Sequence, residues 1–346
     1  MTWRTTLAPL FAALLGLAVL PAHADPAAQQ LKARRQFQHD LVSVLALRAE
    51  PKPLLGAALL ARAGDIDHGG PLDFHHLITR AAKAEGAGPA ENWVRLSDCD
   101  AEADNCPNPD ALSALSAQAP DNAAVWLLRM GQAAHDGHAK DTETALQKAA
   151  EASQYDDYTG QSLQALAIAV MQLPPPPATL SGQGSQRAQV ADLQMALVYG
   201  IGDAQPLPGF HLAAAQCLPK VVKEQPDRRA TCLKLAHVLV WGSSPLARSL
   251  GLHLQSTLAA DDATRQKADA AMRDLTWQVQ HFGQLEARAR TDPELAQRML
   301  MLARQGGTQM SLMQAALRGA DVPLEAPSGW SPRTTPTETP QTSDAP

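Results

Sequence analysis

The fold is decided by residues 119–150, APDNAAVWLLRMGQAAHDGHAKDTETALQKAA, which predict two short helices folded back on each other. In the first helix, apolar residues recur at i, i+3, i+4 and i+7 and form one face, namely Ala123, Trp126, Leu127, Met130 and Ala133. Asp121 is expected to cap this helix, Gly137 to end it, and Asp141 to cap the second helix. The stretch therefore indicates a helical hairpin with a shared apolar interface.

This hairpin resembles the tetratricopeptide family of helical repeats, whose pattern W-x2-L-G-x2-Y, A-x3-F and P extends over about 34 residues. Trp126 stands at the Trp position, and Gly137 and Ala149 stand where the family has small residues. Six other positions depart from the pattern: Arg129, Met130, Ala133, Thr142, Leu146 and Gln154. The resemblance covers about one repeat. It implies stacked hairpins that present a concave face to a protein or peptide.

The rest of the chain is also predicted to be helical, because apolar residues recur at helical spacing between proline and glycine breaks. The expected helices are 29–48, 53–63, 72–84, 186–199, 210–218, 227–241, 262–282 and 308–317, and three more are expected to start at Asp157 or Thr159, at Ser244-Pro245 and at Asp292-Pro293. Strand-like alternation of β-branched residues is missing from the sequence. The predicted fold class is all-α, with antiparallel hairpins stacked into an α-solenoid. The segment 227–241 is apolar nearly all round and is expected to be the most buried helix.

The amino-terminal residues 1–24 predict a bacterial export signal. Arg4 precedes an apolar run over residues 7–20, and Ala22-His23-Ala24 forms a small-x-small cleavage site. Cleavage after Ala24 would place the mature chain in the periplasm or outside the cell. The run is too short to span a bilayer, and no second run of that kind follows, so we expect no membrane span.

Composition divides the mature chain into two helical halves. A Pro/Gly/Ser-rich stretch at residues 174–185 separates an amino-terminal half, 25–173, from a carboxyl-terminal half, 186–320. Residues 321–346 are rich in Pro, Thr and Ser and are expected to form a disordered tail. The formal net charge is −6, and basic residues do not cluster with aromatic ones. Nucleic acid is therefore a poor candidate partner.

The four cysteines predict two disulfides, because the count is even and the expected compartment is oxidising. Pairing neighbours joins Cys99 to Cys106 and Cys217 to Cys232. A four-cysteine zinc site would need C-x2-C pairs, which the sequence lacks.

Three clusters could bind metals, and each has a structural interpretation that we favour. The acidic residues of the loop from Asp98 to Asp104 offer hard oxygen ligands for Ca²⁺, or simply form a solvated loop. His135-x-x-His138 straddles Gly137, so the two rings need not share a face. Met310-x-x-Met313 has a spacing that suits Cu(I) but equally suits a helical core. We therefore predict no metal and no cofactor.

The sequence contains no defined catalytic constellation. Ser311-Leu312-Met313-Gln314 is similar to a Gly-Leu-Met-Gln motif of lytic transglycosylases, which would imply a hydrolase acting on cell-wall material. Those enzymes need a Glu-Ser pair upstream, where this chain has Glu286 and Glu294 without Ser. The favoured expectation is a non-enzymatic binding protein, and the hydrolase is the alternative.

The first helix of the hairpin also suggests where a partner protein or peptide would bind. Trp126 lies on the apolar stripe and is expected to pack between helices. Arg129, Gln132 and Asp136 are expected to project from the opposite side, and they form the predicted partner surface.

Overall fold

The structure is a computed structural model that describes residues 25–67, 69–96, 109–180, 184–202 and 208–332. Within these residues the chain forms sixteen α-helices, one short 3-10 helix and no β-strand, so the predicted all-α class is confirmed. Eight of the α-helices begin at a proline, where the missing N–H costs no hydrogen bond and the fixed φ suits the first turn.

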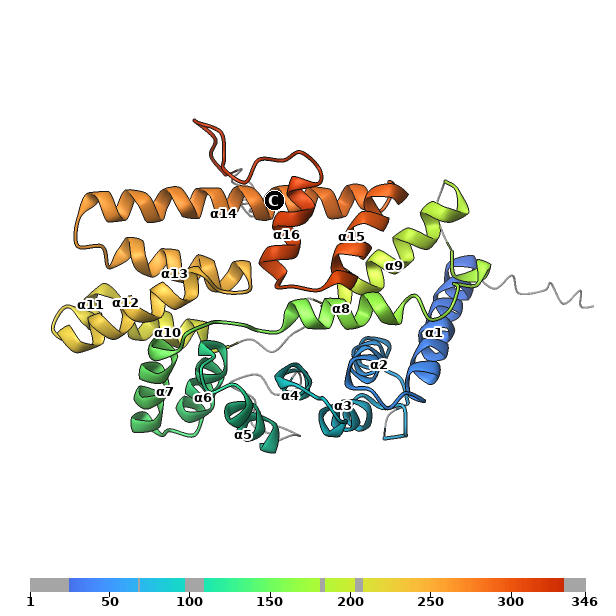
Figure 1. The fold of residues 1–346 in the computed structure, drawn as a ribbon, viewed down its shortest axis with the longest axis horizontal. Coiled ribbons are helices and arrows are strands. Elements are labelled where there is room, and N and C mark those ends of the chain that lie inside the picture. The colour runs from blue at the N-terminus through green and yellow to red at the C-terminus, as the bar shows by residue number, and fades with distance from the viewer. Residues whose placement is uncertain (1–24, 68, 97–108, 181–183, 203–207, 333–346) are drawn as a thin grey trace, which may run out of the picture.

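The first seven helices follow one another along an arc at the lower side of the view in Figure 1. They are α1 (Pro26–Leu45), α2 (Pro51–Gly64), α3 (Phe74–Lys83), α4 (Pro89–Arg95), α5 (Pro109–Gln118), α6 (Ala123–His135) and α7 (Ala139–Glu151). Each of them contacts the next, so neighbours in sequence are neighbours in space. The helices α6 and α7 are the predicted hairpin, and Gly137 between them adopts the expected positive φ of 72°.

Two helices then run through the middle of the molecule. They are α8 (Thr159–Ala169) and α9 (Gln186–Gly202), with the 3-10 turn η1 (Pro177–Thr179) between them. The helix α8 contacts α2 from the first arc and also α15 and α16 from the end of the chain (Figure 1). Gly160 of α8 lies so close to the carbonyl oxygen of Gly307 that a Cβ atom at residue 160 would collide with it.

The remaining helices form the other side of the molecule. They are α10 (Phe210–Gln216), α11 (Pro219–Val222), α12 (Pro226–Val240), α13 (Pro245–Thr257), α14 (Asp262–Ala289), α15 (Pro293–Gln305) and α16 (Gln309–Arg318). The helix α12 packs against α7, where Arg228 forms an ion pair with Glu143. The helix α13 lies between α12 and α14 and contacts both of them.

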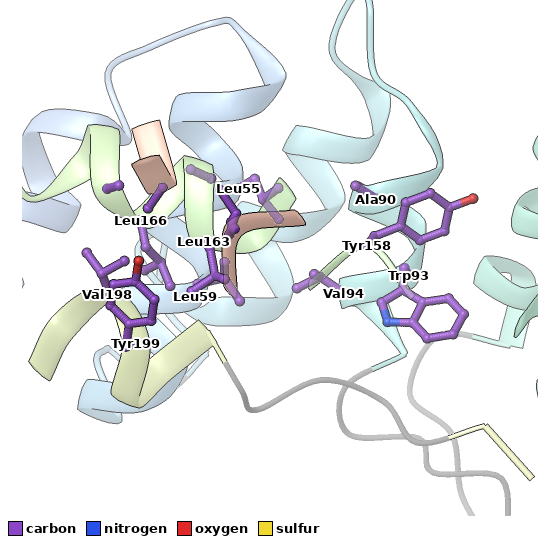
Figure 2. Packing of buried hydrophobic residues seen from close by; sticks show 14 of the residues in the cluster. Leu55, Leu59, Ala90, Trp93, Val94, Tyr158, Leu163, Leu166, Val198 and Tyr199 are labelled. Atoms are coloured by element: carbon purple, nitrogen blue, oxygen red, sulfur yellow. The ribbon is translucent and has the colours of Figure 1, made fainter. Parts of the chain in front are cut away.

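One large hydrophobic cluster includes residues from both sides of the Pro/Gly/Ser-rich stretch at 174–185. Figure 2 shows part of this cluster, where Leu55 and Leu59 of α2 meet Leu163 and Leu166 of α8 and Val198 of α9. The two helical stretches predicted from composition therefore share a core.

The helix α2 is buried more completely than the one expected from its composition. Eight residues of α2, Leu54 to Ala61, are buried, whereas α12 buries only Cys232, Leu235, Ala236 and Leu239. The prediction for 227–241 was therefore wrong. The apolar residues on the other side of α12 face a hollow, and Trp241 at its end remains 74% exposed.

A buried polar junction connects these parts, and we call residues 154–158 with Asn122 and Ser243 the polar joint. The Asn122 side chain is fully buried and donates to the Asp156 carbonyl at 2.7 Å and the Tyr158 hydroxyl at 2.9 Å. Its oxygen accepts from the amides of Ala124 and Asp156. Burial raises the pKa of Tyr158 to about 12, so this hydroxyl remains neutral.

Ser243 extends the polar joint to the second half of the chain. Its hydroxyl accepts from the Asp157 amide at 3.1 Å and donates to the Asp157 carboxylate at 3.2 Å. Its backbone N–H donates to the Tyr155 carbonyl, and its carbonyl accepts from the amide of Met310. The joint therefore ties α6, the turn between α12 and α13, and the start of α16 to one five-residue segment.

The caps of the α6–α7 hairpin differ from those expected. Asn122, not Asp121, caps α6, and Asp141 lies within the first turn of α7 rather than before it. The reason is that the Asp121 carbonyl accepts from the amides of Ser153 and Gln154, which turns its side chain to solvent.

The Cys217–Cys232 disulfide is present, with an S–S distance of 2.03 Å. Both cysteines are buried in a second, smaller hydrophobic cluster with Val222, Ala236, Leu254 and Leu258. The other expected pair, Cys99 and Cys106, lies outside the described residues, as does the acidic loop from Asp98 to Asp104.

The segment 321–332, expected to begin a disordered tail, lies along α14 instead. Trp277 donates from its indole N–H to the Pro323 carbonyl at 2.8 Å, and its ring meets Trp330 edge to face. The Gln278 amide donates to the Leu324 carbonyl at 2.8 Å. The indole of Trp277 thus holds a stretch that its Pro/Thr/Ser-rich composition predicted to be disordered.

The export signal, 1–24, and residues 333–346 lie outside the described part. Among the described helices, none combines the length and the apolar character needed to cross a bilayer.

We predict that Asn122→Ala destabilises the protein by about 2–4 kcal/mol, because it leaves buried donors and acceptors unsatisfied. Asp121→Ala, which changes an exposed side chain, should cost about 0.5 kcal/mol or less. Urea unfolding of both variants tests this expectation. Equal losses would show that Asp121 is as important as the joint.

We also predict that replacing both Cys217 and Cys232 with Ala lowers the free energy of unfolding by about 3 kcal/mol, the loop-entropy value for a closed loop of this size. Thermal melts with and without reductant measure the effect. If reductant leaves the melting temperature of the wild type unchanged, although mass spectrometry shows that Cys217 and Cys232 are reduced, the disulfide does not contribute to stability.

Candidate functional site

A groove of about 850 Å³ lies along α12, α13 and α14. The helix α13 forms its floor, and α12 and α14 form its two walls. We call it the α12–α14 groove. The α12 wall is one helical stripe, because Arg229, Leu233, His237 and Trp241 follow one another at intervals of four residues.

The surface of the groove is mainly apolar. Leu233 and Leu252 face it from α12 and α13, and Ala268, Ala271 and Leu275 line it from α14. The alanines of α14 leave room for a ligand to approach the backbone closely. Trp241 supplies a large aromatic surface at one end of the groove and is largely exposed there. An apolar surface of this kind favours an apolar ligand.

Three cations line the groove, and none of them forms an ion pair with an acidic residue of the described chain. The Arg229 guanidinium donates to the Leu258 carbonyl at 2.7 Å, and that of Arg248 donates to the Gly242 carbonyl at 2.9 Å. Lys267 lies on the α14 wall. Burial lowers the pKa of Arg248 below its ordinary value, because no carboxylate compensates for the lost hydration.

One acidic residue, Asp274, also lines the groove, but it already has partners. Its carboxylate accepts from the Ala326 amide at 3.0 Å and lies 3.7 Å from the Arg273 guanidinium. Gln278 beside it holds the same carboxyl-terminal segment. The segment 321–332 therefore borders the groove at one end, and the remaining charge of the groove is positive.

A second, smaller hollow of about 400 Å³ contains the partner surface predicted from the sequence. Arg129, Gln132 and Asp136 line it, and Gln132 donates to both carboxylate oxygens of Asp136. The structure thus brings the three residues together, in a polar hollow between α6 and α7.

Trp126 packs against the main core, as expected, but it is only half-buried. The expectation that it lies on the side of α6 opposite to Arg129 was wrong, because both residues line the same hollow. The Lys148 ammonium lies 4.3 Å from the centre of its ring and the Arg129 guanidinium 5.9 Å away. Its indole N–H donates to the Pro120 carbonyl at 2.7 Å. The fully buried tryptophan of this region is Trp93, which packs edge to face on Tyr158.

The other sequence candidates do not converge on a site. His135 and His138 are exposed, and the described residues contain no group of three metal-ligating side chains. Met310 and Met313 are buried in the main core, as the structural interpretation expected. Glu286 and Glu294 are not among the residues that line the α12–α14 groove.

The α12–α14 groove has no local signature in the sequence, because its residues come from three helices. The four-residue spacing of Arg229, Leu233, His237 and Trp241 is a local signal, but the same spacing is typical of a buried helix. The arginine among them, Arg229, indicates a surface that is only partly covered.

The fold and its hollows define an all-α protein with an apolar, positively charged groove. Compared with protein-family models, with curated proteins and with solved structures, the chain has no match in any of the three.

We predict that Trp93→Ala costs about 3–5 kcal/mol of stability, as large truncations in cores do. Trp126→Ala should cost only about 1–2 kcal/mol, because the ring is half-exposed and loses only part of a core contact together with its contacts to the two cations. Chemical denaturation of the two variants measures the difference. A larger loss of unfolding free energy for Trp126→Ala than for Trp93→Ala would show that Trp126 is the main tryptophan of the core.

Proposed function

We propose that this protein is an exported, non-enzymatic helical-repeat protein that binds a segment of another protein in the α12–α14 groove. The observation that carries the proposal is a groove of about 850 Å³ with an apolar surface and cations that lack acidic partners. Ligand sites in proteins are usually concave and mainly apolar, with a few polar groups that orient the ligand.

Two further features support this proposal. The helices α1 to α7 contact one another in chain order, as successive hairpins do in tetratricopeptide-like arrays. The Cys217–Cys232 disulfide fits an oxidising compartment, which agrees with the export signal predicted at residues 1–24. We assign the smaller hollow around Arg129, Gln132 and Asp136 a secondary role, because it is more polar and less than half as large.

The experiment places a photo-crosslinking residue at Gln255, which lines the groove, in the full exported chain. We expect crosslinks to a distinct partner protein in the periplasm. Ala271→Trp should abolish them, because the new side chain fills the groove from the α14 wall. The matched control is Ala270→Trp, which adds the same side chain on the exposed side of α14 and should leave the crosslinks unchanged.

Both variants should fold, because residue 270 is exposed and residue 271 is half-buried at the edge of a hollow. Circular dichroism and thermal melts check this condition. Crosslinks that persist equally in Ala271→Trp and Ala270→Trp would show that the groove is not the binding site.

A further inference from the structure

The shape of the α12–α14 groove selects between a helical and an extended ligand. Its lining residues on α14 run from Thr264 to Gln278, which at 1.5 Å per residue corresponds to about 21 Å. That length matches about four turns of a helix. The walls and floor are helices whose backbone groups are already paired, so they offer no strand edge to an extended peptide.

Small side chains permit a helix to approach closely. Ala268 and Ala271 lie one turn apart on the α14 wall, and Ala259 lies where α13 ends. Helices pack at axial distances of about 8–10 Å when the side chains at the contact are small enough. A helix lying over α13 would contact α12 on one side and α14 on the other, and it would cover Leu233, Leu252 and Leu275.

The cations lie towards both ends of the groove. Arg229 is in the first turn of α12 and donates to the carbonyl of Leu258 at the end of α13, on the same side as Lys267 near the start of α14. Arg248 lies at the opposite end, where it donates to Gly242 in the turn between α12 and α13. This arrangement places positive charge beside both ends of a bound helix.

We propose that the occupant of the α12–α14 groove is an amphipathic α-helix of a partner protein, with an apolar stripe flanked by acidic residues. The inference rests on the proposed function and specifies its ligand. Charge complementarity supports it, because Arg229, Arg248 and Lys267 have no acidic partner in the described chain, whereas the whole chain has a net charge of −6. Trp241 would then cover one end of the apolar stripe.

The test uses three synthetic, fluorescently labelled peptides of about 18 residues, long enough to form a helix. The first carries leucines at i, i+3, i+4 and i+7 flanked by glutamates. The second has lysines in place of the glutamates, and the third has the first composition with two central prolines. Fluorescence anisotropy with the full mature chain should give at least about tenfold tighter binding for the first than for the other two.

Variants of the protein then test the charge assignment. Arg229→Glu combined with Lys267→Glu should reverse the preference, so that the lysine peptide binds more tightly than the glutamate peptide. The matched control Lys234→Glu changes an exposed cation of α12 that does not line the groove, and it should leave the preference unchanged. Raising the salt concentration should weaken the glutamate peptide more than the lysine peptide.

Each outcome has a defined meaning. Equal binding of the proline-containing or lysine peptide, still abolished by Ala271→Trp, would overturn the helical or acidic assignment while leaving the proposed function intact. If none of the three peptides binds and the Gln255 crosslinks are also absent, both proposals are overturned.

A dimer that Ala271→Trp dissociates would identify a second copy as the occupant. Tighter peptide binding after truncation at Pro332 would identify the chain's own carboxyl-terminal residues as the occupant. Either of these results would also overturn the assignment to a partner.

Discussion

Asn122 makes four hydrogen bonds from a fully buried side chain, and the arrangement of the helices depends on the segment that it holds. Residues 154–158 pass between two parts of the molecule that are far apart in sequence. On one side they are fixed by the cap of α6, and on the other by Ser243, which is 86 residues beyond Asp157. Polar groups without access to water must find partners inside the protein, so this segment has few alternatives to its present path.

The aromatic residues of the same segment add apolar contacts in the same directions. Tyr158 packs on Trp93 of α4, and Tyr155 stacks on Phe210 of α10 with ring centres 5.8 Å apart. Hydrogen bonds therefore fix the direction of the segment, and the rings contribute buried area. Ser243 lies in the turn between α12 and α13, directly before α13, which forms the floor of the groove. The polar joint therefore also positions the proposed binding site. The small cluster around the disulfide supports the other end of α12 and α13.

The sequence was informative wherever a local signal decides the structure. Prolines at helix starts, the glycine at residue 137 and the apolar periodicity of the helices are local, and these predictions correspond to observed helices. It was less informative where the outcome depends on distant partners. Asp121 and Asn122 are both good caps by type, and only the carbonyl of Asp121, which pairs with Ser153 and Gln154, decides between them. Trp126 and Trp93 are likewise indistinguishable by type, and the packing of Tyr158 decides which of them is buried.

Because α8 contacts helices from both ends of the chain, the helical units of this protein are not independent of one another. An open array of repeats touches only its neighbours, so units can be removed or added at little cost to the rest. Here α8 contacts α2 as well as α15 and α16, and Gly160 lies directly against the backbone at Gly307. Deleting one hairpin from the arc would displace these partners from each other. These contacts of α8 therefore limit how many helices the arc can gain or lose without displacing other parts of the molecule.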